Sequence, residues 1–252
     1  MAGVHVVDLA ERPDLVSALW DLPQPWPAFM GHDPHGVELF PRLPEVFPEW
    51  QLVALDDAGM AVGKVHAVPF AWDLSDPDLP ASGWDGVLAR AFTGRWRGTR
   101  PTAVSLLEAR LAPSHLGGGR SRLLLEAAAE RAVARGLPHL VGPVRPTHKH
   151  LQPHLPMQDY VQQRRADGLP VDPWLRVHAR MGGRVVGTCP ASMVIAGSLA
   201  DWRSWTGLPF DESGATVVPF ALNPVHVSVE QDHAVYVEPN VWVHHDLTGR
   251  TA

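Results

Sequence analysis

A run of glycines between an apolar segment and a charged helix is the part of this sequence best suited to chemistry. The run is Gly117, Gly118 and Gly119, and it leads directly into Arg120, Ser121 and Arg122. Glycines permit a tight backbone turn and keep side chains out of the path of a ligand. The first turn of the following helix presents unpaired N–H groups and the positive end of the helix dipole, which suits a phosphate or another anion. The alternative is an ordinary strand–loop–helix turn.

Two common phosphate-binding motifs do not describe this loop. No Gly-Lys-Ser/Thr follows the glycines, so the Walker pattern is absent. A dinucleotide-binding fold would place its glycine loop after an opening strand near the N-terminus, with an acidic partner in the same βαβ unit, and neither is found here. Neither motif therefore identifies the loop, and both the anion-binding site and the ordinary turn stay open.

The segment from Leu111 to Glu126 resembles motif A of the GNAT acyltransferase superfamily. That motif consists of a strand ending in Val-x-Pro, then Arg/Gln-x-x-Gly-x-Gly/Ala, then a helix with a Leu-Leu pair. Gly119 matches the motif glycine and Leu124-Leu125 match the apolar pair. In this superfamily the loop holds the pyrophosphate of coenzyme A, so the resemblance implies a thioester-donor site at Gly117–Arg122. It also implies that the pantetheine arm pairs with backbone groups near Leu111.

Two positions depart from motif A. Leu116 stands where Arg or Gln is usual, and Ser121 stands where Gly or Ala is usual. The loss of a polar side chain at Leu116 makes an acyl carrier protein, whose phosphopantetheine arm carries the same thioester, an alternative donor to acyl-coenzyme A. The charge distribution also favours this alternative. Between Arg90 and Arg184 there are 16 Lys or Arg against 6 Asp or Glu, in a chain whose net charge is −6, and carrier proteins are generally acidic.

A second resemblance lies downstream, over 172–186. This segment is similar to motif B of the superfamily, a helix that ends in Tyr-x-x-x-Gly-Phe before a strand, and His178 falls on the Tyr. In many GNAT enzymes that Tyr protonates the departing thiolate. The resemblance therefore implies His178 as the catalytic acid, because the pKa of histidine lies near neutrality. The alternative is that His178 only packs beside the splayed strands.

The implied reaction is direct acyl transfer from a thioester to an amine, with the donor between two splayed parallel strands, 103–112 and 139–144. Glu108 is the first candidate for the base that takes the proton of the amine, because it lies on the strand beside the reaction centre. His66 and Glu238 are further candidates. The alternative for Glu108 is a solvent-facing strand residue.

Other reactive residues suggest no site of their own. His148, His150 and His154 lie between prolines with no carboxylate at helix spacing, so we expect no metal site there or elsewhere. Cys189 is the single cysteine, which excludes an intrachain disulfide, and we expect a buried thiol. No Gly-x-Ser-x-Gly elbow is present, which argues against a serine hydrolase.

The pattern of apolar runs and turns predicts an α/β fold with a mixed sheet. The expected strands are 4–9, 51–55, 61–69, 103–112, 139–144, 184–187, 193–195, 216–220, 226–229 and 234–237. The expected helices are 13–20, 86–92, 120–135, 157–165 and 173–181. Between them, 23–48 is expected to form irregular turns over a site, and 73–85 a loop. With the resemblance, this is a GNAT fold: a mostly antiparallel sheet with one splayed parallel pair, flanked by helices, with a core over 1–190 and a β-rich C-terminal extension over 191–252.

Composition narrows the class of protein. The chain is 45% hydrophobic, as expected for a globular protein with a real core, and ten tryptophans fill the core or line a pocket. Trp202 and Trp205 are candidates for an acceptor pocket. No apolar run reaches the ~18–20 residues that span a membrane, and the N-terminus lacks the features of a signal peptide, so we expect a cytoplasmic protein with no membrane partner. No basic–aromatic motif indicates a nucleic-acid partner.

Together these features predict an enzyme that moves an acyl group from a phosphopantetheine thioester to an amine of a small-molecule acceptor. The length beyond a minimal GNAT domain favours a role in specialised metabolite biosynthesis, by analogy. The alternative is a non-catalytic GNAT-like module that binds thioesters, since the departures at Leu116 and His178 are those of a degenerate copy.

Overall fold

Nine strands form one mixed sheet in the described part of the chain. The computed structural model describes residues 3–23, 26–116 and 120–250. The strands are β1 (Val4–Asp8), β2 (Gln51–Asp56), β3 (Ala61–Phe70), β4 (Ala103–Leu111), β5 (His139–Val144), β6 (Arg184–Gly197), β7 (Gly214–Thr216), β8 (Val225–Ser228) and β9 (His233–Asp246). The α-helices are α1 (Val16–Asp21), α2 (Pro34–Leu39), α3 (Leu43–Val46), α4 (Gly83–Arg97), α5 (Arg120–Ala134), α6 (Met157–Tyr160), α7 (Pro173–Arg180) and α8 (Leu199–Thr206). The 3-10 turns are η1 (Pro13–Leu15), η2 (Ala28–His32), η3 (Phe40–Arg42), η4 (Pro48–Trp50), η5 (Asp76–Asp78), η6 (Pro113–His115) and η7 (Lys149–Leu151).

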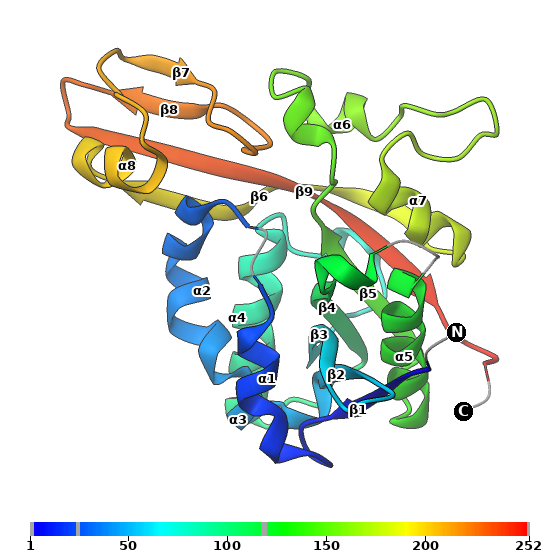
Figure 1. Cartoon of the computed structure of the whole chain (residues 1–252). Helices are drawn as coiled ribbons and strands as arrows, with labels where there is room; N and C mark the ends of the chain where they lie inside the picture. The colour runs from blue at the N-terminus through cyan, green and yellow to red at the C-terminus, as the bar shows by residue number, and fades with distance from the viewer. Residues whose placement is uncertain (1–2, 24–25, 117–119, 251–252) are drawn as a thin grey trace.

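The strands are ordered β1-β2-β3-β4-β5-β9-β8-β7, and β6 pairs with the other edge of β9. Every pair of strands among the described residues is antiparallel except β4 and β5, which run parallel. The predicted mixed, mostly antiparallel sheet is therefore confirmed. Helices α1 to α4 lie on one side of the β1–β5 half and α5 lies on the other (Figure 1). None of the described helices is long and apolar enough to span a bilayer.

Strands β4 and β5 separate toward their C-terminal ends. They pair only near their starts, Val104 with Leu140 and Ser105 with Val141. Beyond these pairs, β4 and β5 continue with no further pairing between them among the described residues. The splayed parallel pair expected from the resemblance is therefore confirmed, and it leaves backbone groups of both strands open to a ligand.

A β-bulge lies in β4 beside this opening. His66 of β3 pairs with Glu108, whereas the next residue of β3, Ala67, pairs with Leu106. Leu107 is therefore an extra residue that has no partner in β3, as in other bulges. The indole N–H of Trp84, on α4, donates to the Leu107 carbonyl oxygen at 3.1 Å. The bulge thus changes the register of β4 at the point where the two strands part.

Helix α5 forms where the sequence predicts it. Its residues are mostly strong helix formers. Its buried side chains recur at intervals of three and four residues, which gives one apolar face toward the sheet. They are Leu124, Leu125, Ala128, Ala129 and Ala132. Gly136, at φ 71°, adopts the left-handed conformation that ends the helix.

The C-terminal strands are longer than predicted. Short strands were expected at 184–187, 193–195 and 234–237, but β6 and β9 each have 14 residues and pair along most of their length. Irregularities in β6 between Val185 and Gly187 and between Cys189 and Met193 interrupt the sequence pattern without ending the strand. The expected boundary at residue 190 lies within β6. The strand predicted over 216–220 is wrong beyond Thr216, where β7 ends.

Three helix predictions also need correction. Residues 83–85, expected in a loop, form the first turn of the 15-residue α4, which extends well beyond the short helix expected at 86–92. Contacts of α4 with β3 and β6 explain a helix that its glycines and aromatic residues disfavour. The helix expected over 157–165 ends at Tyr160, because Arg164 instead forms a bridge with Pro170. The helix expected over 13–20 begins as the turn η1.

Gly63 lets β3 approach β4 closely. A Cβ atom on Gly63 would lie 2.9 Å from the Arg110 carbonyl oxygen and 2.9 Å from Leu111 Cδ2. Such overpacking typically costs about 1–3 kcal/mol, so we expect Gly63→Ala to lower the free energy of unfolding by about that amount. Denaturant unfolding tests this. Gly187→Ala is the matched control, because a Cβ there meets nothing within 4 Å, and equal losses in both variants would contradict the prediction.

Candidate active site

The donor side of the site is formed by the end of β4 and the start of α5. Ala112 N–H donates to the Val62 carbonyl on the β3 side at 2.8 Å. Successive strand residues direct their backbone groups to opposite edges, so Leu111 directs its N–H and C=O away from β3, to the edge that β5 leaves unpaired. This is the edge where a pantetheine arm was expected to pair. The role of Leu111 stays a prediction that this geometry allows.

The glycines of the predicted phosphate loop, Gly117, Gly118 and Gly119, lie outside the described residues. On either side of them, Leu116 is exposed and Arg120 begins α5. Ser121 and Arg122 belong to the first turn of α5, where free N–H groups and the dipole favour an anion. Arg122 also donates to Glu126 one turn later, at 2.7 Å, on the helix surface. The described residues are thus arranged as a strand end followed by a helix N-terminus.

Glu108 is buried at the bulge, not exposed on a solvent-facing strand. Its carboxylate lies 3.3 Å from Lys64 Nζ, 3.7 Å from His66 Nε2 and 3.4 Å from Arg110 Nη1. Trp26, in the segment before η2, donates its indole N–H to Glu108 Oε1 at 3.2 Å. We call Lys64, His66, Glu108 and Arg110 the β3–β4 cluster. It places one carboxylate among basic groups at the edge of the strand opening.

The tautomer of His66 follows from its neighbour Gln51. The Gln51 amide N–H groups donate to the carbonyls of Phe47 and Ala67 at 2.9 and 3.0 Å, so its oxygen is the atom that faces His66. His66 Nδ1–H therefore donates to Gln51 Oε1 at 2.8 Å, and Nε2 carries a lone pair toward Glu108. Burial, followed by the charges of Lys64 and Arg110, holds the pKa of His66 well below its ordinary value. The ring is thus a neutral acceptor.

Lys64 is fully buried, and burial lowers its pKa although Glu108 raises it. Its ammonium also lies 5.5 Å from the ring centre of Trp20, on α1. Burial likewise lowers the pKa of Arg110 against the opposing effect of Glu108. The Glu108 carboxylate therefore compensates both cations. A proton taken up by Glu108 would disturb the whole β3–β4 cluster.

Trp26 connects this cluster to a second buried ion pair. Arg145, just after β5, lies over the Trp26 ring at 5.3 Å. Its Nε donates to both oxygens of Glu238 on β9, at 3.1 and 3.0 Å. Tyr236 O–H and Asn240 Nδ2 also donate to this carboxylate, at 2.9 and 3.1 Å. Glu238, a secondary candidate for the base, is therefore occupied by three donors.

His178 lies in a different environment from Glu108. Its Nδ1 is 2.9 Å from His245 Nε2, and the ring is buried. His245 on β9 pairs with Leu140 on β5, and Leu140 pairs with Val104 on β4. Glu108 lies four residues beyond Val104 along β4, a distance of roughly 13 Å at 3.3 Å per residue. Burial, then His245, lowers the pKa of His178 to about 3, so the ring is neutral at pH 7. Its role as the acid stays a prediction and would require donation from a neutral imidazole.

The histidine pair predicts a loss of stability in acid. Burial lowers the pKa of His178 to about 3 and that of His245 to about 4, against an ordinary 6.5. Between pH 6.5 and 4 the unfolded chain binds more protons than the folded chain, so the free energy of unfolding falls as the pH falls, by up to about 1.4 kcal/mol per pH unit for each ring. Urea unfolding at pH 6.5 and 4.5 should show a smaller acid loss in His178→Gln than in the wild type. An unchanged acid loss would contradict this.

The remaining predicted residues lie outside the β3–β4 cluster. Trp202 is fully buried in the core between α8 and β9, which corrects its placement in an acceptor pocket, and its indole donates to the Ala234 carbonyl. Trp205 lines a small cavity of about 180 Å³ together with Pro27 and Phe220. Cys189 is buried as expected, and burial raises the pKa of its thiol.

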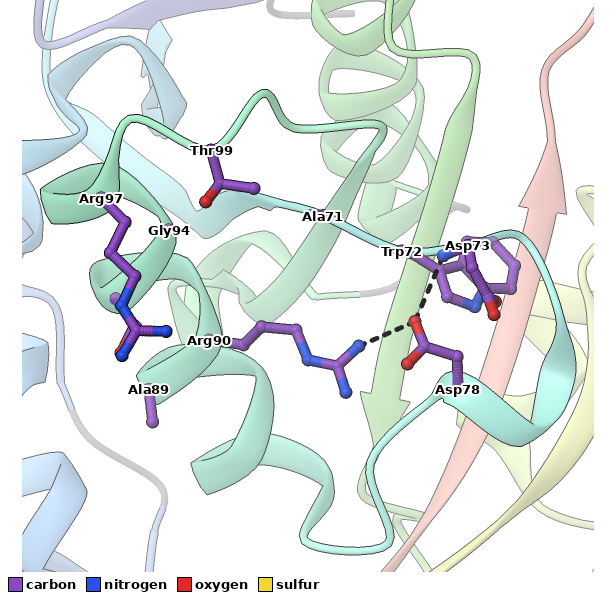
Figure 2. A pocket seen from close by; sticks show the side chains of 10 residues that line it. Ala71, Trp72, Asp73, Asp78, Ala89, Arg90, Gly94, Arg97 and Thr99 are labelled. Carbon is purple, nitrogen blue, oxygen red and sulfur yellow. Dashed lines mark hydrogen bonds and ion pairs between the residues drawn. The ribbon is translucent and has the colours of Figure 1, made fainter.

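A further cavity has a volume of about 600 Å³ (Figure 2). It is bounded by residues that follow β3 and by the outer side of α4, and Arg90 points across it to Asp78 at 2.9 Å. The cavity begins just after Phe70, the last residue of β3, which pairs with Ala103 at the start of β4. Glu108 lies five residues beyond Ala103 along β4, a distance of roughly 16 Å. This cavity is therefore not part of the acyl-transfer site.

The sequence predicted Glu108 and His66 but not the other groups that surround Glu108. No sequence motif indicated that Trp26, Lys64 or Arg145 would belong to the site. A signal was present for Lys64, because Lys64-x-His66 and Glu108-x-Arg110 place polar residues at alternate positions of otherwise apolar strands. No local pattern indicated that Trp26 would reach Glu108 across 82 positions of the sequence.

Comparison with known proteins adds sequence and fold relationships. No protein-family model matches the chain. The arginine N-acetyltransferase avaD of Aspergillus versicolor is 31% identical over 278 aligned positions, which cover 97% of this chain and 94% of that protein. The loading GNATL domain of CurA from Lyngbya majuscula shares the fold at a TM-score of 0.63 and 17% identity, covering 99% of this chain and 100% of that domain. The GNAT-like decarboxylase GphF, solved with isobutyryl-CoA, has a TM-score of 0.57 and 21% identity, covering 97% and 99%.

Proposed function

The chain belongs to the GNAT superfamily and is an N-acyltransferase, and from this premise we propose that its donor is a phosphopantetheine thioester and its acceptor a small-molecule amine. The observation that carries the proposal is the 31% identity to an arginine N-acetyltransferase over almost the full length of both chains. That relationship argues against the alternative of a non-catalytic module. A role in specialised metabolite biosynthesis is part of the proposal.

The donor would lie in the opening between β4 and β5. The unpaired backbone edge at Leu111 supports this placement, because an extended pantetheine amide can pair with a strand edge. The N-terminal turn of α5, with Arg120 and Arg122, would receive phosphate groups. The exposed Leu116 replaces a polar donor expected from the family, so coenzyme A and a carrier protein both remain candidate donors.

In the proposed reaction the amine nitrogen attacks the thioester carbonyl carbon. A C–N bond forms, the C–S bond breaks, and the sulfur leaves as a thiolate that is then protonated. Glu108 accepts the proton that the amine loses, since it is the carboxylate at the bulge beside the opening. Backbone N–H groups near the bulge would stabilise the oxyanion. The protonation of the thiolate is assigned to His178 by family resemblance.

The acceptor would approach from the side of Trp26. Residues 26–48 cover the β3–β4 cluster, since Trp26 donates a hydrogen bond to Glu108 and Phe40 packs against His66. Movement of Trp26 would expose Glu108 and Arg145 together. Arginine is the first acceptor to examine, because the relative avaD is an arginine N-acetyltransferase. Its carboxylate could pair with a guanidinium such as that of Arg145.

A donor and acceptor screen tests the proposal. Full-length protein is incubated with acetyl-coenzyme A or with the matched acetyl-carrier protein, plus arginine and a panel of other amines. Release of free thiol and the mass of the N-acetyl product are recorded. We expect thiol release coupled to product with at least one donor. Failure to form product from either donor with any amine would overturn the proposal, and comparison of the two rates identifies the donor.

A further inference from the structure

Two buried aspartates meet where α2 and α4 begin. Asp33 precedes α2, and its Oδ2 accepts from Gly36 N–H at 2.7 Å. Asp85 lies in the first turn of α4. The backbone N–H of Val194, on β6, interacts with both carboxyl groups. The three elements therefore hold two carboxyl groups side by side, outside the β3–β4 cluster.

These carboxyl groups have oxygens without partners. Asp33 is 1% exposed and Asp85 is 6% exposed. Among the described residues, Asp33 Oδ1 and Asp85 Oδ1 are buried and accept no hydrogen bond. A buried carboxylate without compensation is costly, and two adjacent ones repel each other. A further carboxylate, Glu238, is already paired with Arg145 and adds to the repulsion at Asp85. The pair thus requires a proton or a cation.

His35 adds a nitrogen ligand on the solvent side of the pair. Its Nδ1 is 3.7 Å from Asp85 Oδ2, and its side chain is half-exposed. One ligand atom from each of Asp33, His35 and Asp85 lies within 4.8 Å of the other two. A metal ion with bonds of about 2.0–2.2 Å separates its ligands by somewhat over 3 Å, so a small movement of the exposed His35 ring would close the set. His35 also gives an ion a path from solvent.

We propose that Asp33, His35 and Asp85 form a binding site for a divalent transition-metal ion with the ligand preferences of Zn²⁺. Two carboxylates and one imidazole leave a fourth position for water, and the nitrogen ligand favours Zn²⁺ over Ca²⁺ or Mg²⁺. The two carboxylate charges balance the charge of the ion. A guanidinium or another organic cation is disfavoured, because Asp33 has no exposed surface against which a planar group could lie. This site was not expected from the sequence.

The bound ion would link α2, α4 and the β6 backbone. The residues before α2 include Trp26, so this link would fix the segment that covers Glu108. The role is structural and positioning, and it takes no part in the acyl-transfer chemistry. The proposal is therefore independent of the proposed function and is tested by binding and stability.

The experiment measures Zn²⁺ binding to metal-free full-length protein by calorimetry and by the shift in Tm. We expect one ion per chain and a higher Tm with Zn²⁺. Asp33→Asn keeps an oxygen that can accept from Gly36 N–H, so it should remain folded while Zn²⁺ affinity falls at least tenfold. His35→Gln changes a half-exposed side chain and should have a similar effect. Asp201→Asn, at the N-terminus of α8, is the control, since Asp201 likewise takes part in the capping of a helix, by accepting from Ser198, but lies outside the cluster.

Each outcome decides the proposal. Loss of binding in Asp33→Asn and His35→Gln, with wild-type affinity in Asp201→Asn, supports it. No stoichiometric Zn²⁺ binding by the wild type would show that the pair holds only a proton. Unchanged affinity in Asp33→Asn, with circular dichroism confirming the fold, would place the ion elsewhere. Tighter binding of Mg²⁺ or Ca²⁺ than of Zn²⁺ would overturn the assignment of the metal class.

Discussion

Glu108→Gln is expected to lower kcat by about 10²- to 10⁴-fold, the usual contribution of a positioned general base. Glutamine has nearly the same shape and can still accept from the Trp26 indole, but it cannot take a proton from the amine. The KM for the thioester donor should change little, because the donor is expected to bind along Leu111 and α5. Steady-state kinetics measures both effects.

A control is needed because Glu108 also compensates Lys64. Removing the carboxylate leaves Lys64 buried without its nearest anion, which can destabilise the fold independently of catalysis. The free energy of unfolding of Glu108→Gln should therefore be measured beside its kinetics. Glu130→Gln, which removes an exposed carboxylate from α5, should match the wild type in both. A kcat for Glu108→Gln within threefold of the wild type would exclude Glu108 as the base and direct attention to the neutral His66.

Arg145→Leu is expected to lower the free energy of unfolding by about 3–5 kcal/mol, the typical cost of removing one partner of a buried ion pair. Arg145 makes two hydrogen bonds to Glu238, whose side chain is 1% exposed. Without Arg145, the carboxylate keeps only the neutral donors Tyr236 and Asn240. The remaining buried charge, more than the lost contact, accounts for most of the expected effect. Denaturant unfolding measures it.

A double variant separates these two contributions. Arg145→Leu combined with Glu238→Gln removes both charges and keeps an acceptor for Tyr236, so most of the lost stability should return. Arg12→Leu is the exposed control, because Arg12 pairs with Asp14 at the surface and such pairs contribute little. If Arg145→Leu is as stable as the wild type, or if the double variant is no better than the single one, the pair does not act as a compensated buried charge.

The site and the acceptor path meet at Trp26. This side chain donates to Glu108 and stacks under Arg145, so it links the β3–β4 cluster to the Arg145–Glu238 pair. An amine that reaches Glu108 must pass or displace it. Under the proposed function, the donor would lie on the α5 side of the opening and the acceptor on the side of α1 and α2 (Figure 1). This division is consistent with direct transfer without an acyl-enzyme intermediate.

The local sequence determined the elements that depend on neighbouring residues. The hydrophobic periodicity and helix-forming composition of 120–135 predicted α5, and the apolar runs before and after it predicted β4 and β5. The motif around Gly119 and Leu124 then predicted the family and the splayed parallel pair. These predictions succeeded because strand–loop–helix geometry is encoded within about 40 consecutive residues, where propensity and pattern act together.

The tertiary structure alone decided which side chains meet. Trp26 reaches Glu108, Arg145 reaches Glu238 and His178 reaches His245 across 82, 93 and 67 positions. None of these pairs has a sequence signature, because each depends on strand order and register, here the bulge at Leu107 and the pairing of β9 with β5. The same register buries Glu108 among basic groups, which the sequence alone did not predict. The lengths of β6 and β9 were likewise set by their mutual pairing, which overrides the local breaks at Pro190 and Pro239.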